Sequence, residues 1–99
     1  MEIKIKATKI ELTEAIETAI KEKFGNLDKY YHNIINIDVE VGKTTAHHHK
    51  GDFFRAEVNL KIPKKIIRAE AETDDLYKSL TEVKEKLKVE LVKYKEKNN

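Results

Sequence analysis

Three consecutive histidines, His47 to His49, are the side chains of this chain best suited to chemistry. Imidazole nitrogens bind zinc, but adjacent residues point in different directions, so one metal could take two of these rings with Asp52 as a third ligand. In the loop predicted from Gly42 to Asp52, the rings could instead contact the bases or phosphates of an RNA. We favour a loop without metal, whose possible RNA contacts are His47, His48, His49 and Lys50.

Carboxylates are abundant, yet they suggest no catalytic pair. Glu57, Glu70 and Glu72 are expected on the outward face of a sheet beside Arg55 and Arg68, where cross-strand ion pairs explain them. The 3 glycines are too dispersed to form a phosphate-binding loop, and no nucleophile-elbow or metalloprotease motif occurs. We therefore expect a protein that is not an enzyme and that uses no cofactor and no small-molecule substrate.

Lysine gives the clearer signal. The chain has 18 lysines and 2 arginines, yet its net charge is only +2, so any basic surface must be local. Six lysines and three glutamates follow from residue 84 onward. Lysine is a point charge suited to phosphates, whereas bidentate contacts with bases favour arginine. The pattern favours binding to a polyanion, although lysines beside an apolar stripe also keep a helix soluble.

One long helix, from Thr73 to Lys97, must position most of these lysines. Thr73 is predicted to cap it, and Asp74 and Asp75 add negative charge where the helix dipole favours it. Apolar residues recur at steps of three and four and share one face: Leu76, Leu80, Val83, Leu87, Leu91 and Tyr94. This face is predicted to be buried.

The lysines flank that stripe on both sides. At about 100° per residue, Lys86 and Lys93 lie on one flank, with Lys97 nearby. The other flank carries Lys84, Lys88 and Lys95, beside Tyr77. Val89 and Val92 are predicted on the outer side, which is unusual for a surface that only faces water.

The rest of the chain supplies the sheet on which this helix rests. Alternating apolar residues predict four strands, around residues 2–6, 35–41, 54–62 and 67–71. A first helix opens at Thr13 and stops at Gly25 and Asn26. Short connections predict a meander of the last three strands, with the first helix as a crossover. Since one sheet face is apolar, both helices should pack on it, which gives a single two-layer α+β domain of order β-α-β-β-β-α.

Composition excludes several protein classes. Charged residues make up 38% of the 99 residues, and there is no cysteine, so we expect no disulfides and a reducing, cytoplasmic setting. The N-terminus lacks the apolar run of a signal peptide. No stretch approaches the ~20 apolar residues of a transmembrane helix, so no membrane association is expected.

Two blocks of the sequence match a known family. Asp74-Asp75-Leu76-Tyr77, followed by Lys86-Leu87, Leu91, Lys93, Tyr94 and Lys95, resembles the hallmark of the ribosome hibernation-promoting and ribosome-associated inhibitor proteins. The first helix is similar to theirs at its start, Glu11 to Ile16, and at its end, Lys23-Phe24 and Leu27 to Tyr30. The resemblance covers essentially the whole chain.

The resemblance implies a fold like that of double-stranded-RNA-binding domains and a ribosome-binding inhibitor of translation. Such proteins occupy the mRNA and tRNA channel of the small ribosomal subunit and contact rRNA phosphates, with no chemical step. The implied contacts are Lys29, Lys86 and Lys93, with Lys23 and Lys95 beside them, and the helical wheel adds Lys84 and Lys88.

The sequence also departs from the family. Val89 stands where relatives commonly carry arginine, and Asn26 where they often carry lysine. The chain ends at Asn99, so we expect one domain, 1–99, without the C-terminal domain with which longer relatives pair ribosomes. We expect a monomer off the ribosome. The alternative is a module for a structured RNA outside the ribosome, or a protein-interaction domain, which Val89 and Val92 favour.

Overall fold

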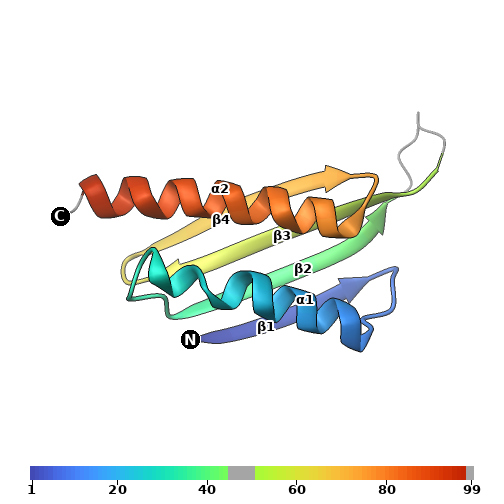
Figure 1. Ribbon diagram of the computed structural model, residues 1–99, viewed down its shortest axis with the longest axis horizontal. Helices are drawn as coiled ribbons and strands as arrows, with labels where there is room; N and C mark the ends of the chain where they lie inside the picture. Colours follow the sequence, from blue (N-terminus) through green and yellow to red (C-terminus); the bar gives the residue numbers. More distant parts are fainter. Residues whose placement is uncertain (45–50, 98–99) are drawn as a thin grey trace.

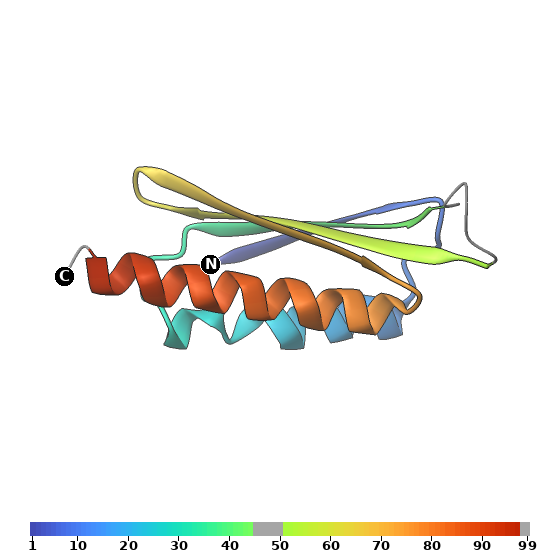
Figure 2. The ribbon, with the colours of Figure 1, turned by 90° about the horizontal axis from the view of Figure 1, so that it is seen from above.

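Two helices lie side by side on one face of a four-stranded sheet, and the other face of the sheet is open (Figures 1 and 2). This computed structural model describes residues 1–44 and 51–97. The elements, in chain order, are β1 (Glu2–Thr8), α1 (Glu14–Gly25), the 3-10 helix η1 (Leu27–Lys29), β2 (Asn36–Thr44), β3 (Phe53–Ile62), β4 (Lys65–Thr73) and α2 (Leu76–Lys97). The predicted two-layer α+β fold and its element order are confirmed.

The strands are ordered β1-β2-β3-β4, as they follow in the chain. β1 pairs in parallel with β2, with Ile3 opposite Ile37, because the crossover through α1 returns the chain in the same direction. β2, β3 and β4 form the predicted antiparallel meander. The β3–β4 turn is Pro63-Lys64, and Lys64 adopts a φ of 68°, the left-handed value that the second central residue of a type II turn requires.

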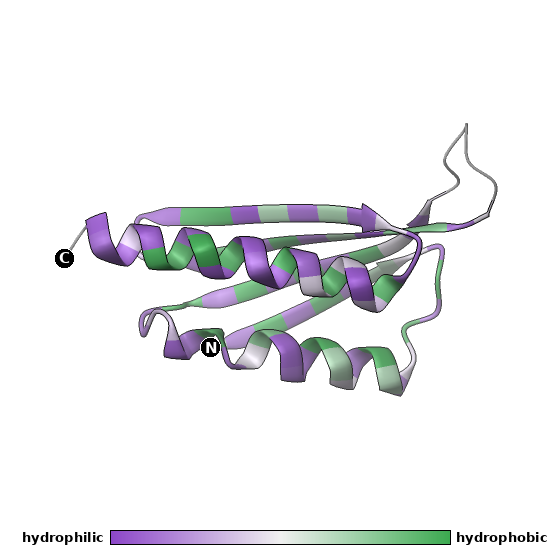
Figure 3. Ribbon diagram, turned by 45° about the horizontal axis from the view of Figure 1, so that its top comes forward, coloured by the Kyte–Doolittle hydropathy of each residue, from purple (hydrophilic) through white to green (hydrophobic). Residues whose placement is uncertain are grey.

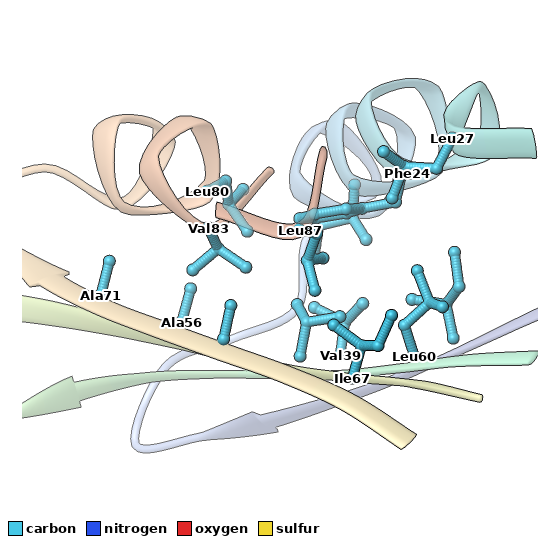
Figure 4. Packing of buried hydrophobic residues seen from close by; sticks show 14 of the residues in the cluster. Phe24, Leu27, Val39, Ala56, Leu60, Ile67, Ala71, Leu80, Val83 and Leu87 are labelled. Carbon is cyan, nitrogen blue, oxygen red and sulfur yellow. The ribbon is translucent and has the colours of Figure 1, made fainter. Parts of the chain in front are cut away.

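The core lies between the sheet and the helices. Apolar and polar residues alternate along the strands, as the hydropathy colouring of Figure 3 shows, and the alternate apolar residues of β2, β3 and β4 are buried. The stripe of α2 meets them: Leu80, Val83 and Leu87 are fully buried and pack above Val39, Ala56 and Ile67 (Figure 4). From the other helix, Phe24 completes the layer. Burying one such leucine contributes about 1.5–3 kcal/mol, so the stripe holds α2 in place.

The first helix begins and ends as predicted. Thr13 accepts a hydrogen bond from the Ile16 N–H at 3.2 Å and so satisfies one of the unpaired donors of the first turn. At the other end the Asn26 N–H donates to the Phe24 carbonyl, and the chain continues into η1. η1 places Tyr30 and Tyr31 beside the second helix.

The predicted cap of the second helix is wrong by two residues. Thr73 is the last residue of β4 and is paired with Phe54, so it cannot open the helix. Asp75 is the cap instead, since its carboxylate accepts the Lys78 N–H at 3.2 Å and its carbonyl accepts the first helical bond, from Ser79. Thr73 supports this cap, because its hydroxyl accepts the Asp75 N–H.

The β2–β3 connection is shorter than the loop predicted from Gly42 to Asp52. β2 continues to Thr44, which pairs with Phe53, the first residue of β3. Gly42 lies within β2 and pairs with Thr8 and Arg55. A Cβ at this position would lie 3.0 Å from the Thr8 carbonyl oxygen, which explains why glycine occupies it. Residues 47–50, with the predicted RNA contacts of the histidine run, lie outside the described residues.

The start of the second strand was also predicted one residue early. Ile35 precedes β2 and is exposed, with its N–H donating to the Lys61 carbonyl at 2.8 Å. The alternating pattern of residues 35–41 contained Ile35, but the strand begins at Asn36.

Candidate nucleic-acid interface

The second helix carries its lysines in two rows on opposite sides. Because successive residues turn by about 100°, Lys84, Lys88 and Lys95 lie roughly opposite Lys86 and Lys93 across the helix. We call the first set the α1-facing row and the second the β4-facing row, from the contacts described next. The two flanks predicted from the sequence are therefore separate surfaces.

The α1-facing row lies against the first helix and η1. Lys23 of α1 donates from Nζ to the Thr81 hydroxyl of α2 at 3.0 Å. The Nζ of Lys88 lies 5.2 Å from the centre of the Tyr30 ring, and that of Lys29 lies 5.3 Å from the same centre. These contacts place Lys29 beside Lys88 of the α1-facing row, and Lys23 against α2. Together with the other two lysines of that row they form a group that we call the basic patch: Lys23, Lys29, Lys84, Lys88 and Lys95.

The charges of the basic patch are not neutralised by carboxylates. The three contacts just described go to a hydroxyl and to an aromatic ring, which carry no net charge. Within residues 1–44 and 51–97, none of the five lysines forms an ion pair. Lys84 and Lys88 are half-buried, so their stems are held by packing while their charges stay uncompensated. Such a group of cations suits an RNA backbone.

The β4-facing row has different neighbours. Lys86 donates from Nζ to the Glu70 carbonyl of β4 at 2.7 Å. Lys93 lies 3.9 Å from the carboxylate of Glu90. The groove between α2 and β4 is also lined by Glu85, so two glutamates, Glu85 and Glu90, lie near these lysines. The positive electrostatic potential of the β4-facing row is therefore weaker than the number of its lysines suggests.

The outer side of α2 separates the two rows. Val89 is 47% exposed and Val92 is 36% exposed, as the helical wheel predicts. Glu82 and Glu85 are exposed on the same side. Because a helix is about 10–12 Å wide with its side chains, one nucleic-acid strand cannot contact both rows without passing around this apolar and acidic surface.

The open face of the sheet is a self-paired surface. Arg55 donates to Glu57 and Glu70, and Arg68 donates to the same two carboxylates, so the predicted cross-strand ion pairs are confirmed for these four residues. The hydrogen bond from Arg55, with a further one from Arg68, lowers the pKa of Glu57, and the hydrogen bond to Glu57 raises the pKa of Arg55. Glu72 instead accepts from the Thr44 hydroxyl at 2.7 Å. This network explains the carboxylates without catalysis.

Among the described residues no three His, Cys, Asp or Glu side chains gather as a metal site, and Asp52 pairs with Lys43 at 3.1 Å. The histidines that would complete the alternative with Asp52 lie outside the described part of the chain. No helix in residues 1–44 or 51–97 is long and apolar enough to cross a membrane.

Comparison with known proteins identifies the family. Residues 3–99 match the model of the sigma 54 modulation protein / S30EA ribosomal protein family. The chain belongs to this family. It is 32% identical over 103 residues to a ribosome hibernation promotion factor of Lactococcus lactis subsp. cremoris, a match that covers 96% of this chain and 50% of that protein. A ribosome hibernation promotion factor of Staphylococcus aureus is 31% identical over 88 residues, 89% of this chain and 45% of that protein.

Two solved structures share the fold of this chain. A ribosomal subunit interface protein from Coxiella burnetii superposes with a TM-score of 0.78 at 25% identity, covering 96% of this chain and 98% of that one. The N-terminal domain of Protein Y from Thermus thermophilus gives a TM-score of 0.75 at 24% identity, covering 95% and 99%. The chain spans about half the length of the curated relatives that it matches.

Sequence reasoning missed the neutral partners of the basic patch. Thr81 contacts Lys23 across 58 positions of the chain, and no local pattern indicates such a pair. Tyr30 lies between Lys29 and Lys88, which only the packing of η1 against α2 brings together. The seven predicted rRNA-binding lysines stay predictions, now divided between two surfaces.

Proposed function

We propose that this protein is a ribosome-binding inhibitor of translation that contacts rRNA phosphates of the small subunit through its basic patch. The observation that supports the proposal most is that none of the five lysines of the basic patch forms an ion pair within residues 1–44 and 51–97. Membership of a family whose curated relatives are named ribosome hibernation promotion factors supports the same choice of partner.

The mechanism that we propose is occlusion. The protein would occupy the channel for mRNA and tRNA on the small subunit and hold the ribosome inactive, with no bond made or broken. Helices α1 and α2 suit this role because a rigid helical layer fixes the lysines before binding, which lowers the entropy cost of association. A protein with this role works in the cytoplasm.

The electrostatics of the patch give the proposal a quantitative form. Each phosphate that a lysine neutralises releases counterions, so log K falls with log salt by about 0.7 to 0.9 per contact. Five contacts would give a slope of about −3.5 to −4.5. Binding should therefore weaken strongly between low and physiological salt.

Cosedimentation with purified small subunits over a range of salt concentrations tests the proposal, with translation measured in parallel. We expect comigration at low salt, a steep loss as salt rises, and inhibition that follows occupancy. Lys61→Gln, on the open face of the sheet, is the control and should bind like the wild type. Protein that stays unbound at every salt concentration would exclude the proposed function.

The second candidate function is a protein-interaction domain. Ile66 and Val89 are both exposed and line the groove between α2 and β4, and exposed apolar residues can mark an interface. Val89→Glu should abolish binding of a protein partner and leave binding to small subunits intact. Loss of small-subunit binding in this variant would instead place the outer side of α2 in the ribosome contact.

A further inference from the structure

One tyrosine of this chain differs from the others in its surroundings. Of the four tyrosines, Tyr30 lies near two lysines, and Tyr31 packs edge-on against Tyr94, with ring centres 5.8 Å apart. Tyr94 also lies 5.1 Å from the Nζ of Lys65. Tyr77 is 47% exposed, and no described residue pairs with its ring or hydroxyl.

The position of Tyr77 on the helix places it at one end of the basic patch. It lies in the first turn of α2, next to the buried Leu76. Thr81 and Lys84 follow at steps of four and three, so the three side chains share the α1-facing flank. Thr81 holds the Nζ of Lys23 at 3.0 Å, which places a second cation one turn from the tyrosine.

An exposed aromatic ring beside uncompensated lysines matches the chemistry of single-stranded RNA binding. Bases stack on aromatic side chains while neighbouring cations hold the phosphates. Lys84 follows Tyr77 by seven residue steps of helix, about 10 Å along the axis. A nucleotide stacked on the ring therefore keeps the phosphates of its own chain within reach of the lysine side chains.

We propose that Tyr77 is a stacking site for an unpaired nucleobase, at the end of the basic patch that Lys23 and Lys84 begin. This inference rests on the proposed function, since it takes the ligand of the patch to be RNA. Every base has an aromatic face, so the site tolerates any sequence. It selects unpaired nucleotides because the faces of paired bases are covered by stacking within the duplex.

Substitution separates stacking from charge. Tyr77→Ala should weaken binding to small subunits roughly 5- to 150-fold, the range for loss of one stacked base, with the salt slope unchanged. Tyr77→Phe keeps the ring and should bind like the wild type. Lys84→Gln is the matched control from the same flank, and it should make the salt slope less steep by about 0.7 to 0.9.

A fluorescent reporter tests the contact directly. The chain contains no tryptophan, so Tyr77→Trp introduces a single indole that can also stack. A single-stranded oligoribonucleotide should quench its emission, and a duplex of the same sequence should quench it less at equal occupancy, with occupancy followed by anisotropy of the labelled RNA. Val92→Trp, on the outer side of α2, is the control and should keep its emission.

The outcomes distinguish this inference from the function on which it rests. If the wild type fails to bind small subunits, both are excluded. If the wild type binds and Tyr77→Ala binds equally well, the stacking site alone is excluded. Equal losses in Tyr77→Ala and Tyr77→Phe would also exclude it, because they would assign the contact to the hydroxyl. Thermal unfolding of each variant, expected to match the wild type, confirms that the helix is intact.

Discussion

The two flanks of α2 carry the same kind of residue in different surroundings. On the α1-facing flank, Lys88 lies over the Tyr30 ring and Lys23 reaches the Thr81 hydroxyl. On the β4-facing flank, Lys86 is bound to a backbone carbonyl and Lys93 lies near Glu90. The number of lysines on a helix therefore does not measure its affinity for phosphate. The charge of the groups beside each lysine determines how strongly that lysine attracts a phosphate.

The largest effect should come from a cavity in the buried apolar stripe of α2, because this stripe holds both flanks of the helix in place. Leu87 is fully buried in the stripe of α2. Leu87→Ala should lower the free energy of unfolding by about 2–5 kcal/mol, because the cavity cannot close fully, and should weaken ribosome binding through both rows. Urea denaturation measures it. Val89→Ala, on the exposed side, should stay within about 0.5 kcal/mol of the wild type.

The second effect distinguishes the two rows. Replacing Lys84 and Lys88 together by Gln should make the salt slope of small-subunit binding less steep by about 1.4 to 1.8, the sum of two phosphate contacts. Replacing Lys86 and Lys93 together by Gln should change it less, since these lysines already have a carbonyl or carboxylate neighbour. Sedimentation over a salt series measures both. The opposite ranking would move the contact surface to the β4-facing row.

A third, smaller effect concerns the open face of the sheet. The pKa of Glu57 is lowered in the folded protein by Arg55 and Arg68, so its stabilising contribution is present at neutral pH and is lost as the pH falls through the carboxyl range. Glu57→Gln should cost about 1 kcal/mol at pH 7 and reduce the acid dependence of the melting temperature. Small-subunit binding should not change. If the melting temperature of the variant depended on pH as that of the wild type does, Glu57 would not be the source of that dependence.

The smallest effect on stability is expected from two lysines within the α1-facing row. Lys88→Met keeps the packing of the stem but removes the charge over Tyr30, and should cost about 0.5 kcal/mol of stability. Lys84→Met has no such ring contact among the described residues and should cost less. Thermal unfolding of the two variants tests this difference. Equal melting temperatures would mean that the contact with Tyr30 adds nothing measurable.

The fold could be predicted from the sequence because its signals are periodic and local. Alternation in residues 54–62 identified the inner face of β3, and steps of three and four identified the stripe of α2, both of which are buried as expected. The topology followed from the lengths of the connections. The errors lie where two elements meet. Thr73 is a good cap by residue type, but it pairs with Phe54 and therefore belongs to β4. Asp75 caps the helix instead.

The candidate site was less predictable for a related reason. The wheel separated Lys86 and Lys93 from Lys84, Lys88 and Lys95, since that depends only on helical geometry. The neighbours of the lysines come from other elements: Tyr30 follows η1, Thr81 lies opposite Lys23, and the Glu70 carbonyl belongs to β4. No pattern in the chain itself carries these pairings, because they form only when separate elements pack.

The parallel pairing of β1 has a consequence for the timing of motion in this protein. β1 is an edge strand that pairs with β2 alone, and its inward residues Ile3, Ile5 and Ala7 are only half-buried. It should therefore open more readily than the central β3, and its opening would loosen α1, which supplies Lys23. A partner that needs Lys23 in place would then slow that opening. Amide hydrogen exchange should show faster exchange in β1 than in β3, and a selective slowing of β1 when small subunits are bound.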